Sequence, residues 1–234
     1  MENHKKYVYR FKIRKDLVEQ VEINLSFPKL ALDLKPIPNA PKWTHLDFKR
    51  CPNCKLDLSK NRYCPIAYNL LPYIKKFKDY MTFKEIEIDV ITKERTYSKK
   101  TSMADGLSSL FGLVMASSGC PDLDWLRPMV NTHLPFATGS ETAHRALSTY
   151  VLAQYYRKKK GLEPDFELND LVNIYKEISI INSAFLKRLK GNNELTDSML
   201  EPLQKLSCFT IFTVASIEDK FMKEIKDIFY KYIN

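Results

Sequence analysis

The chain has 234 residues, enough for one large domain or two modest ones. Hydrophobic residues make up 44% of it and only 6 residues are glycine, which excludes a disordered chain and a nucleotide site built from a glycine loop. No apolar run approaches the roughly 18–20 residues needed to cross a bilayer, and the N-terminus lacks a secretory signal pattern. We therefore expect a cytoplasmic protein without membrane insertion.

The net charge of +9 is concentrated in the first part of the chain. Residues 1–101 contain 22 Lys and Arg against 12 Asp and Glu, which leaves 15 against 16 for residues 102–234. This asymmetry predicts two regions of different character and makes a polyanion a candidate partner of the first region.

Alternating apolar and polar residues predict strands over about 7–13, 17–25 and 30–34, and a hairpin over about 86–100. Apolar spacing of three and four predicts helices in the rest of the chain. Their expected ranges are about 65–80, with Pro72 as a kink or true start, then 102–116, 121–130, 140–160 and 167–190, a helix from 196 interrupted near Pro202, and a last helix capped by Ser216 and Asp219.

These elements predict an α+β fold. An N-terminal antiparallel sheet of about four to six strands, with one helix, occupies residues 1–101, and an all-helical half of about five or six helices occupies residues 102–234. The sequence has no flexible linker near residue 101, so we expect the two regions to share a core.

Short side chains recur along one face of the helix expected over residues 102–116. Gly106, Ser109, Gly112 and Ala116 form this small-residue stripe, which predicts close contact between the helix backbone and a neighbouring element.

Four cysteines are the clearest candidates for chemistry. Cys51 and Cys54 form a Cys-Pro-x-Cys pair, and Cys64 and Cys120 each precede a proline at an expected helix start. A helix N-terminus favours a thiolate, and four thiolates can close a tetrahedral zinc site. The sequence predicts a structural zinc site that joins the sheet region to the helical region.

Several alternatives to zinc remain open. An iron–sulfur cluster uses the same thiolates, and its motifs also place proline after cysteine. His45 and His133 are substitute ligands if Cys120 lies elsewhere. Without a metal, Cys51 and Cys54 are a free or redox-active dithiol and the other two are buried thiols. Cys208 is expected in the core.

Polar residues around position 140 suggest a second site. Glu141 and His144 form a single Glu-x-x-His step, whereas di-metal bundles use two, so we interpret it as surface or helix-start chemistry. Together with His133 and Arg145 these residues could line a small polar pocket; alternatively, His133 is a hydrogen-bonded structural histidine.

Aromatic residues stand among cations in the basic region, with Tyr7, Tyr9, Phe11 and Tyr97 near Lys and Arg. Sheet-borne aromatics beside cations stack the bases of single-stranded RNA in several modules. A shared core face for Tyr7, Tyr9 and Phe11 is the stronger interpretation, so nucleic-acid binding is an alternative that we do not favour.

Seven phrases resemble an uncharacterised bacterial family of unknown function. They are Cys51-Pro-Asn-Cys54, Tyr63-Cys-Pro65, Glu94-Arg-Thr-Tyr-Ser-Lys-Lys100, Gly106-Leu-Ser-Ser-Leu110, Met115-Ala-Ser-Ser-Gly-Cys-Pro121, Leu126-Arg-Pro-Met129 and His133-Leu-Pro-Phe-Ala137. The resemblance implies a bacterial protein and brings no activity or cofactor.

The sequence thus favours a metal-site protein with a binding or scaffolding role and no catalytic residue, for which another protein is a candidate partner. The alternatives are a redox protein and an RNA-binding module.

Overall fold

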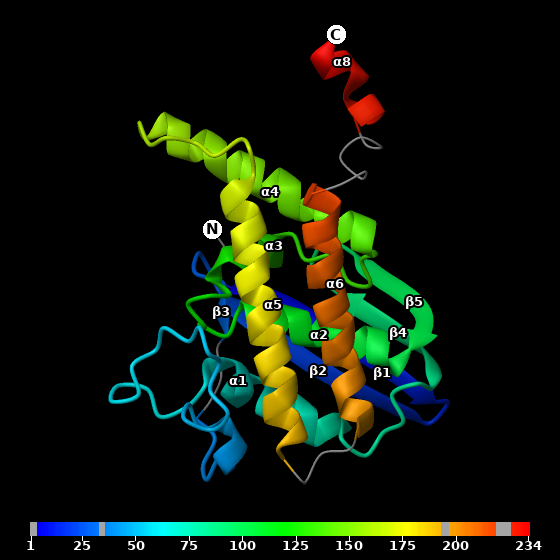
Figure 1. Ribbon diagram of the computed structural model, residues 1–234. Helices are drawn as coiled ribbons and strands as arrows, with labels where there is room; N and C mark the ends of the chain where they lie inside the picture. The colour runs from blue at the N-terminus through cyan, green and yellow to red at the C-terminus, as the bar shows by residue number, and fades with distance from the viewer. Residues whose placement is uncertain (1–3, 33–35, 193–196, 219–225) are drawn as a thin grey trace.

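A computed structural model of the chain describes residues 4–32, 36–192, 197–218 and 226–234. The N-terminal region forms an antiparallel sheet in the order β3-β2-β1-β4-β5 (Figure 1). The strands are β1 His4–Arg14, β2 Leu17–Ser26, β3 Ala31–Leu32, β4 Glu85–Ile91 and β5 Thr96–Ser102. The predicted α+β class and antiparallel sheet are therefore confirmed, although the third strand is shorter than expected.

The sheet follows the two-residue period of its sequence. Tyr7, Tyr9 and Phe11 of β1 are at most 1% exposed, whereas Arg10 and Arg14 on the opposite face are exposed. One face of the sheet is therefore apolar and has to be covered by helices.

Helices form most of the remaining described residues. They are α1 Pro65–Phe77, α2 Met103–Ala116, α3 Arg127–Asn131, α4 Gly139–Lys159, α5 Asn169–Lys190, α6 Glu201–Glu218 and α8 Tyr230–Ile233, with short 3-10 turns at Lys42–Thr44, Asp124–Leu126, Asp197–Leu200 and Asp227–Phe229. The ends of α4 and α5 agree with the sequence, since α4 stops before Gly161 and α5 stops at Gly191.

Helix α1 begins at Pro65 and runs through Pro72, so this proline is not the true start of the helix, and the kink stays a prediction. Three other expectations about helix boundaries are wrong. No helix starts at Pro121, where the chain makes turns before α3. Pro202 occupies the start of α6, a position that needs no backbone N–H donor, and Ser216 lies within that helix. Asp219, its expected capping partner, lies outside the described residues.

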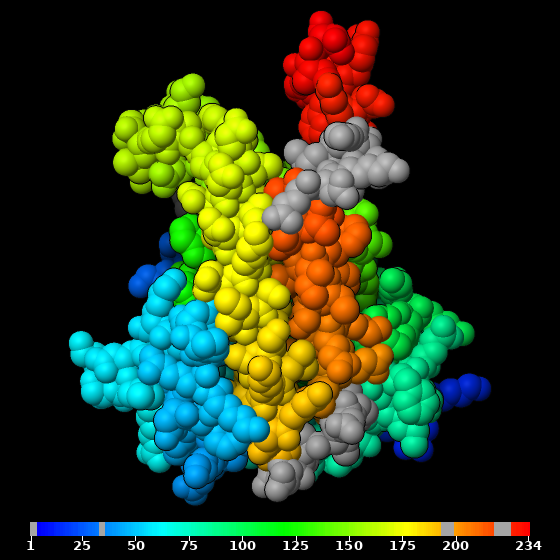
Figure 2. Space-filling view, in the orientation of Figure 1, coloured from blue at the N-terminus to red at the C-terminus, as the bar shows by residue number. Residues whose placement is uncertain are grey.

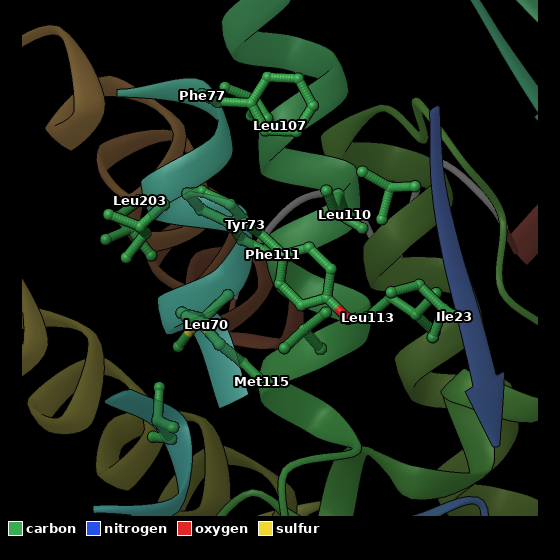
Figure 3. Packing of buried hydrophobic residues seen from close by; sticks show 14 of the residues in the cluster. Ile23, Leu70, Tyr73, Phe77, Leu107, Leu110, Phe111, Leu113, Met115 and Leu203 are labelled. Carbon is green, nitrogen blue, oxygen red and sulfur yellow. The ribbon is translucent and has the colours of Figure 1, made fainter. Parts of the chain in front are cut away.

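Helix α2 lies in the middle of the molecule. It packs on β1, β4 and β5 on one side and on α6 on the other, with α1 beside it (Figure 1). Figure 3 shows Leu107, Leu110 and Phe111 of α2 among the side chains of α1, β2 and α6. A helix covered on several sides has to be apolar around most of its circumference, and α2 is.

Helices α5 and α6 run side by side over α2 and form the outer layer (Figure 2). One hydrophobic cluster contains buried residues of the sheet, of α1, α2, α5 and of the start of α6. No helix among the described residues is long and apolar enough to cross a membrane.

Candidate functional site

The structure does not support the predicted metal site. Among the residues that it describes, no group of three or more His, Cys, Asp or Glu side chains is placed to hold a metal ion. The prediction of a zinc site at Cys51, Cys54, Cys64 and Cys120 is therefore wrong. The two histidines suggested as substitute ligands make other contacts. His45 packs against Tyr63, and His133 is hydrogen-bonded to Tyr9.

All five cysteines are free thiols. Burial raises the pKa of Cys51 to about 11, with smaller contributions from Cys64 and Cys54, and burial raises the pKa of Cys120 to about 12. Both of these thiols are neutral at pH 7, which makes them poor nucleophiles and weakens the dithiol alternative. The expectation of a core position for Cys208 is also wrong, because this residue is exposed on α6.

Polar contacts hold the cysteine-bearing loop against the helical region. Asn53 Nδ2 donates to Glu177 Oε2 of α5 at 2.6 Å, and Lys55 Nζ lies 2.5 Å from Oδ1 of buried Asp122. Arg188 of α5 reaches the segment before the loop, where it donates to the carbonyls of Trp43 and His45. These polar contacts, and not a metal ion, connect the sheet region to the helical region.

The alternative in which nucleic-acid bases stack on the aromatic residues of β1 is also wrong for Tyr7, Tyr9 and Phe11. Tyr7, Tyr9 and Phe11 are buried in the core and cannot reach a base. Binding of a polyanion by the exposed cations of the sheet stays a prediction.

A cavity with a volume of about 370 Å³ lies between α2, α5, α6 and the segment 123–138. Most of its wall is apolar, with contributions from Leu113, Leu126, Met129, Ile178, Leu206 and Phe209. The small-residue stripe explains part of this space. Gly106 makes the expected close approach to Ile88 and Phe11 of the sheet, and Gly112 makes one to Leu206 of α6. Gly112 also lines the cavity with Ser109 and Ala116, whose short side chains leave part of it empty.

A polar cluster of three residues lies at the cavity wall. The hydroxyl of Tyr9 is 2.6 Å from Nε2 of His133 and 3.1 Å from Oγ of Ser109, which is itself 3.4 Å from the same Nε2. Burial, with the nearby charges of Arg145 and Lys5, lowers the pKa of His133 to about 3. His133 is therefore a neutral, hydrogen-bonded histidine at pH 7.

The turn after His133 has an unusual backbone conformation. Phe136, which also lines the cavity, has a φ of 61°, in the left-handed region that costs a residue with a side chain roughly 1–2 kcal/mol. Such strain persists only where surrounding contacts impose it, and it is commonly found at functional sites.

Arg145 of α4 contributes a charge to the same wall. Its Nη2 donates to the carbonyls of Met129 at 2.9 Å and Thr132 at 2.8 Å, which places the guanidinium beside the His133 turn. Desolvation lowers the pKa of Arg145, although an arginine remains charged in proteins.

Of the four residues suggested for a small polar pocket, His133 and Arg145 line this mostly apolar cavity, and His133 is also hydrogen-bonded, as its structural alternative implied. Glu141 and His144 do not line it. Glu141 forms a capping box with Thr138, as its helix-start interpretation implied, and His144 stacks near Phe229.

Three further polar residues line the cavity from the helices. Asn182 of α5 donates to Thr210 Oγ1 of α6 at 2.9 Å, and both residues are buried. Oγ of buried Ser108 has no hydrogen-bond partner within the described part of the chain. Sequence reasoning missed Asn182, Thr210 and Ser108, because a polar residue on a helix is usually interpreted as exposed.

The geometry is poorly suited to acyl transfer. Ser109 and His133 are a possible nucleophile and base, but the Nε2 of His133 already binds Tyr9, and a pKa of about 3 makes this imidazole a weak base. No carboxylate of the described residues hydrogen-bonds to the ring to orient it. The arrangement is better suited to holding a molecule than to activating one.

Comparisons with curated proteins and with solved structures found no match. A family model does match, over residues 7–230, which is nearly the whole chain. The chain belongs to the family described as a domain of unknown function, DUF6901.

Proposed function

We propose that this protein binds a small amphipathic molecule in the cavity between α2, α5 and α6. The observation that carries this proposal is the combination of an apolar wall with a few converging polar groups, in a cavity of about 370 Å³. Ligand sites of proteins typically have volumes of roughly 300–1,000 Å³ and this composition.

The volume limits the size of the ligand. One water molecule occupies about 30 Å³ in the liquid, so the cavity has room for about a dozen non-hydrogen atoms. The apolar wall favours a hydrocarbon body, and Ser109, His133 and Arg145 favour a polar group at one position on it.

Native mass spectrometry and a fluorescent probe test the proposal. The full-length protein should bind 2-naphthol, a fluorescent probe small enough for this cavity, with a saturable change in its fluorescence, and a twelve-atom amphiphile such as decanoate should displace the probe. A ligand that binds only the folded state should also raise the melting temperature as its concentration rises above Kd.

A variant that fills the cavity locates the binding. Met129 is half-buried at the wall, so Met129→Trp should occupy the space and reduce probe binding at least about tenfold while the protein stays folded. Met81→Trp is the matched control, because Met81 is 65% exposed and lies away from the cavity. Equal probe binding by both variants would contradict the proposed site.

A further inference from the structure

The charges around the cavity indicate which polar group the ligand carries. The guanidinium of Arg145 lies beside the His133 turn, since it donates to the carbonyl of Thr132, the residue before His133. Both of its hydrogen bonds within the described residues come from Nη2 and end on backbone carbonyls, which are neutral acceptors. The guanidinium therefore binds no counter-charge there, and the donors of Nε and Nη1 remain for another acceptor.

The acidic groups near this wall are already engaged. Glu141, one helical turn before Arg145, accepts the backbone N–H of Thr138 at 2.7 Å in the capping box. Asp105, at another part of the wall, forms an ion pair with Lys205 at 2.7 Å. Neither carboxylate forms an ion pair with Arg145.

Other cations add to the positive potential of the wall. Lys99 lines the cavity, and together with Arg145 it contributes to the lowered pKa of Glu141, which arises first from the hydrogen bonds of Thr138. Lys5 lies close enough to lower the pKa of His133. Its charge also interacts with the carboxylate of Glu94, whose pKa it lowers. A cavity wall with low polarity strengthens the attraction of these charges for an anion.

We propose that the ligand carries one anionic group, of the carboxylate kind, which binds Arg145. The donors of Nη2 are taken by the two backbone carbonyls, but Nε and Nη1 of Arg145 can each donate a charge-assisted hydrogen bond to a carboxylate oxygen. Oγ of Ser109 lies by His133 on the same wall and can donate to a second acceptor of the ligand. This inference depends on the proposed function, because it concerns the polar group of the same ligand.

A charge series on one hydrocarbon body tests the inference. Decanoate, 1-decanol and decylamine share a ten-carbon chain and carry a negative, a neutral and a positive head at pH 7. Below the concentrations at which they form micelles, the wild-type protein should bind decanoate about 10- to 100-fold more tightly than 1-decanol, and decylamine least tightly. Displacement of 2-naphthol and isothermal titration calorimetry measure the three affinities.

Variants of Arg145 test whether this residue causes the preference for decanoate over 1-decanol. Arg145→Gln keeps amide donors for the two carbonyls but removes the charge, so it should lose most of the preference for decanoate and still bind 1-decanol. Arg145→Lys should retain part of the preference, and it serves as the test if the glutamine variant does not fold. Arg157→Gln is the control, because Arg157 lies on the same helix, away from the cavity, and donates to the carbonyl of Glu163.

The outcomes separate this inference from the proposed function. Equal binding of decanoate and 1-decanol by the wild-type protein overturns the anionic head and leaves the apolar site standing. An undiminished preference in Arg145→Gln overturns the role of Arg145. Failure of all three amphiphiles and of the probe to bind overturns the proposed function itself, and this inference with it.

Discussion

Arg188 offers the sharpest test of how the two regions of the chain are joined. Its side chain is 1% exposed, and its Nη1 donates to Trp43 O at 2.9 Å and to His45 O at 2.6 Å. The contact of Nη2 with Leu46 O, at 3.4 Å, is too long to add much. The ring of Phe48 lies 6.0 Å from the guanidinium carbon.

We expect Arg188→Met to destabilise the protein by about 3 kcal/mol. Methionine fills much of the same space but cannot donate, so two buried carbonyls lose their charged partner, at about 1.5 kcal/mol for each hydrogen bond. Removing a buried charge offsets part of this loss, which is why we use the lower end of the range for such bonds. For a chain of this length, that loss corresponds to a melting temperature about 6–12 °C lower.

Thermal and urea unfolding, followed by far-ultraviolet circular dichroism, measure the effect. Lys187→Met is the matched control, because Lys187 is the preceding residue of α5 and is exposed, and its change should stay within about 0.5 kcal/mol. A melting temperature of Arg188→Met within about 2 °C of wild type would refute the reasoning, since the buried hydrogen bonds would then contribute nothing net.

Three further predictions concern packing, protonation and thiol reactivity. Gly106→Ala should lower the free energy of unfolding by about 1–2 kcal/mol, measured by urea denaturation, because the new Cβ would collide with Ile88 and this cost exceeds the gain in helix propensity. The lowered pKa of His133, about 3 against about 6.5 in the unfolded chain, means that only the unfolded state takes up the proton as the pH falls from 6.5 towards 3. Stability should therefore drop by up to about 2 kcal/mol between pH 6.5 and 5, and a His133→Gln variant with the same slope would contradict this cause. Iodoacetamide at pH 7.5 should label exposed Cys208 well before Cys120, whose thiol pKa is raised by burial, as peptide mass spectrometry can show.

Local patterns account for what the sequence predicted correctly. The period of two in β1 placed Tyr7, Tyr9 and Phe11 on one buried face, and glycines beyond basic last turns located the ends of α4 and α5. These features depend on residues within a few positions of one another, so they can be inferred without tertiary contacts.

The cysteines show where this reasoning fails. Their spacing and their prolines fit a thiolate site, and Cys64 does precede the first residue of α1 as predicted. No helix begins after Cys120, however, because Pro121 lies in a run of turns. Whether four distant sulfur atoms meet around one ion depends on the path of the backbone, and that path is not encoded in their spacing.

The sequence by itself determined the α+β class and most strands and helices. Only the tertiary structure decided that Arg188, a cation in the last turn of a helix, is buried, and that Ser109 and Gly112 border a cavity. The physical reason is that secondary structure follows from interactions between near neighbours in the chain. Burial and empty space depend instead on how side chains from distant segments fill, or fail to fill, the volume between α2, α5 and α6.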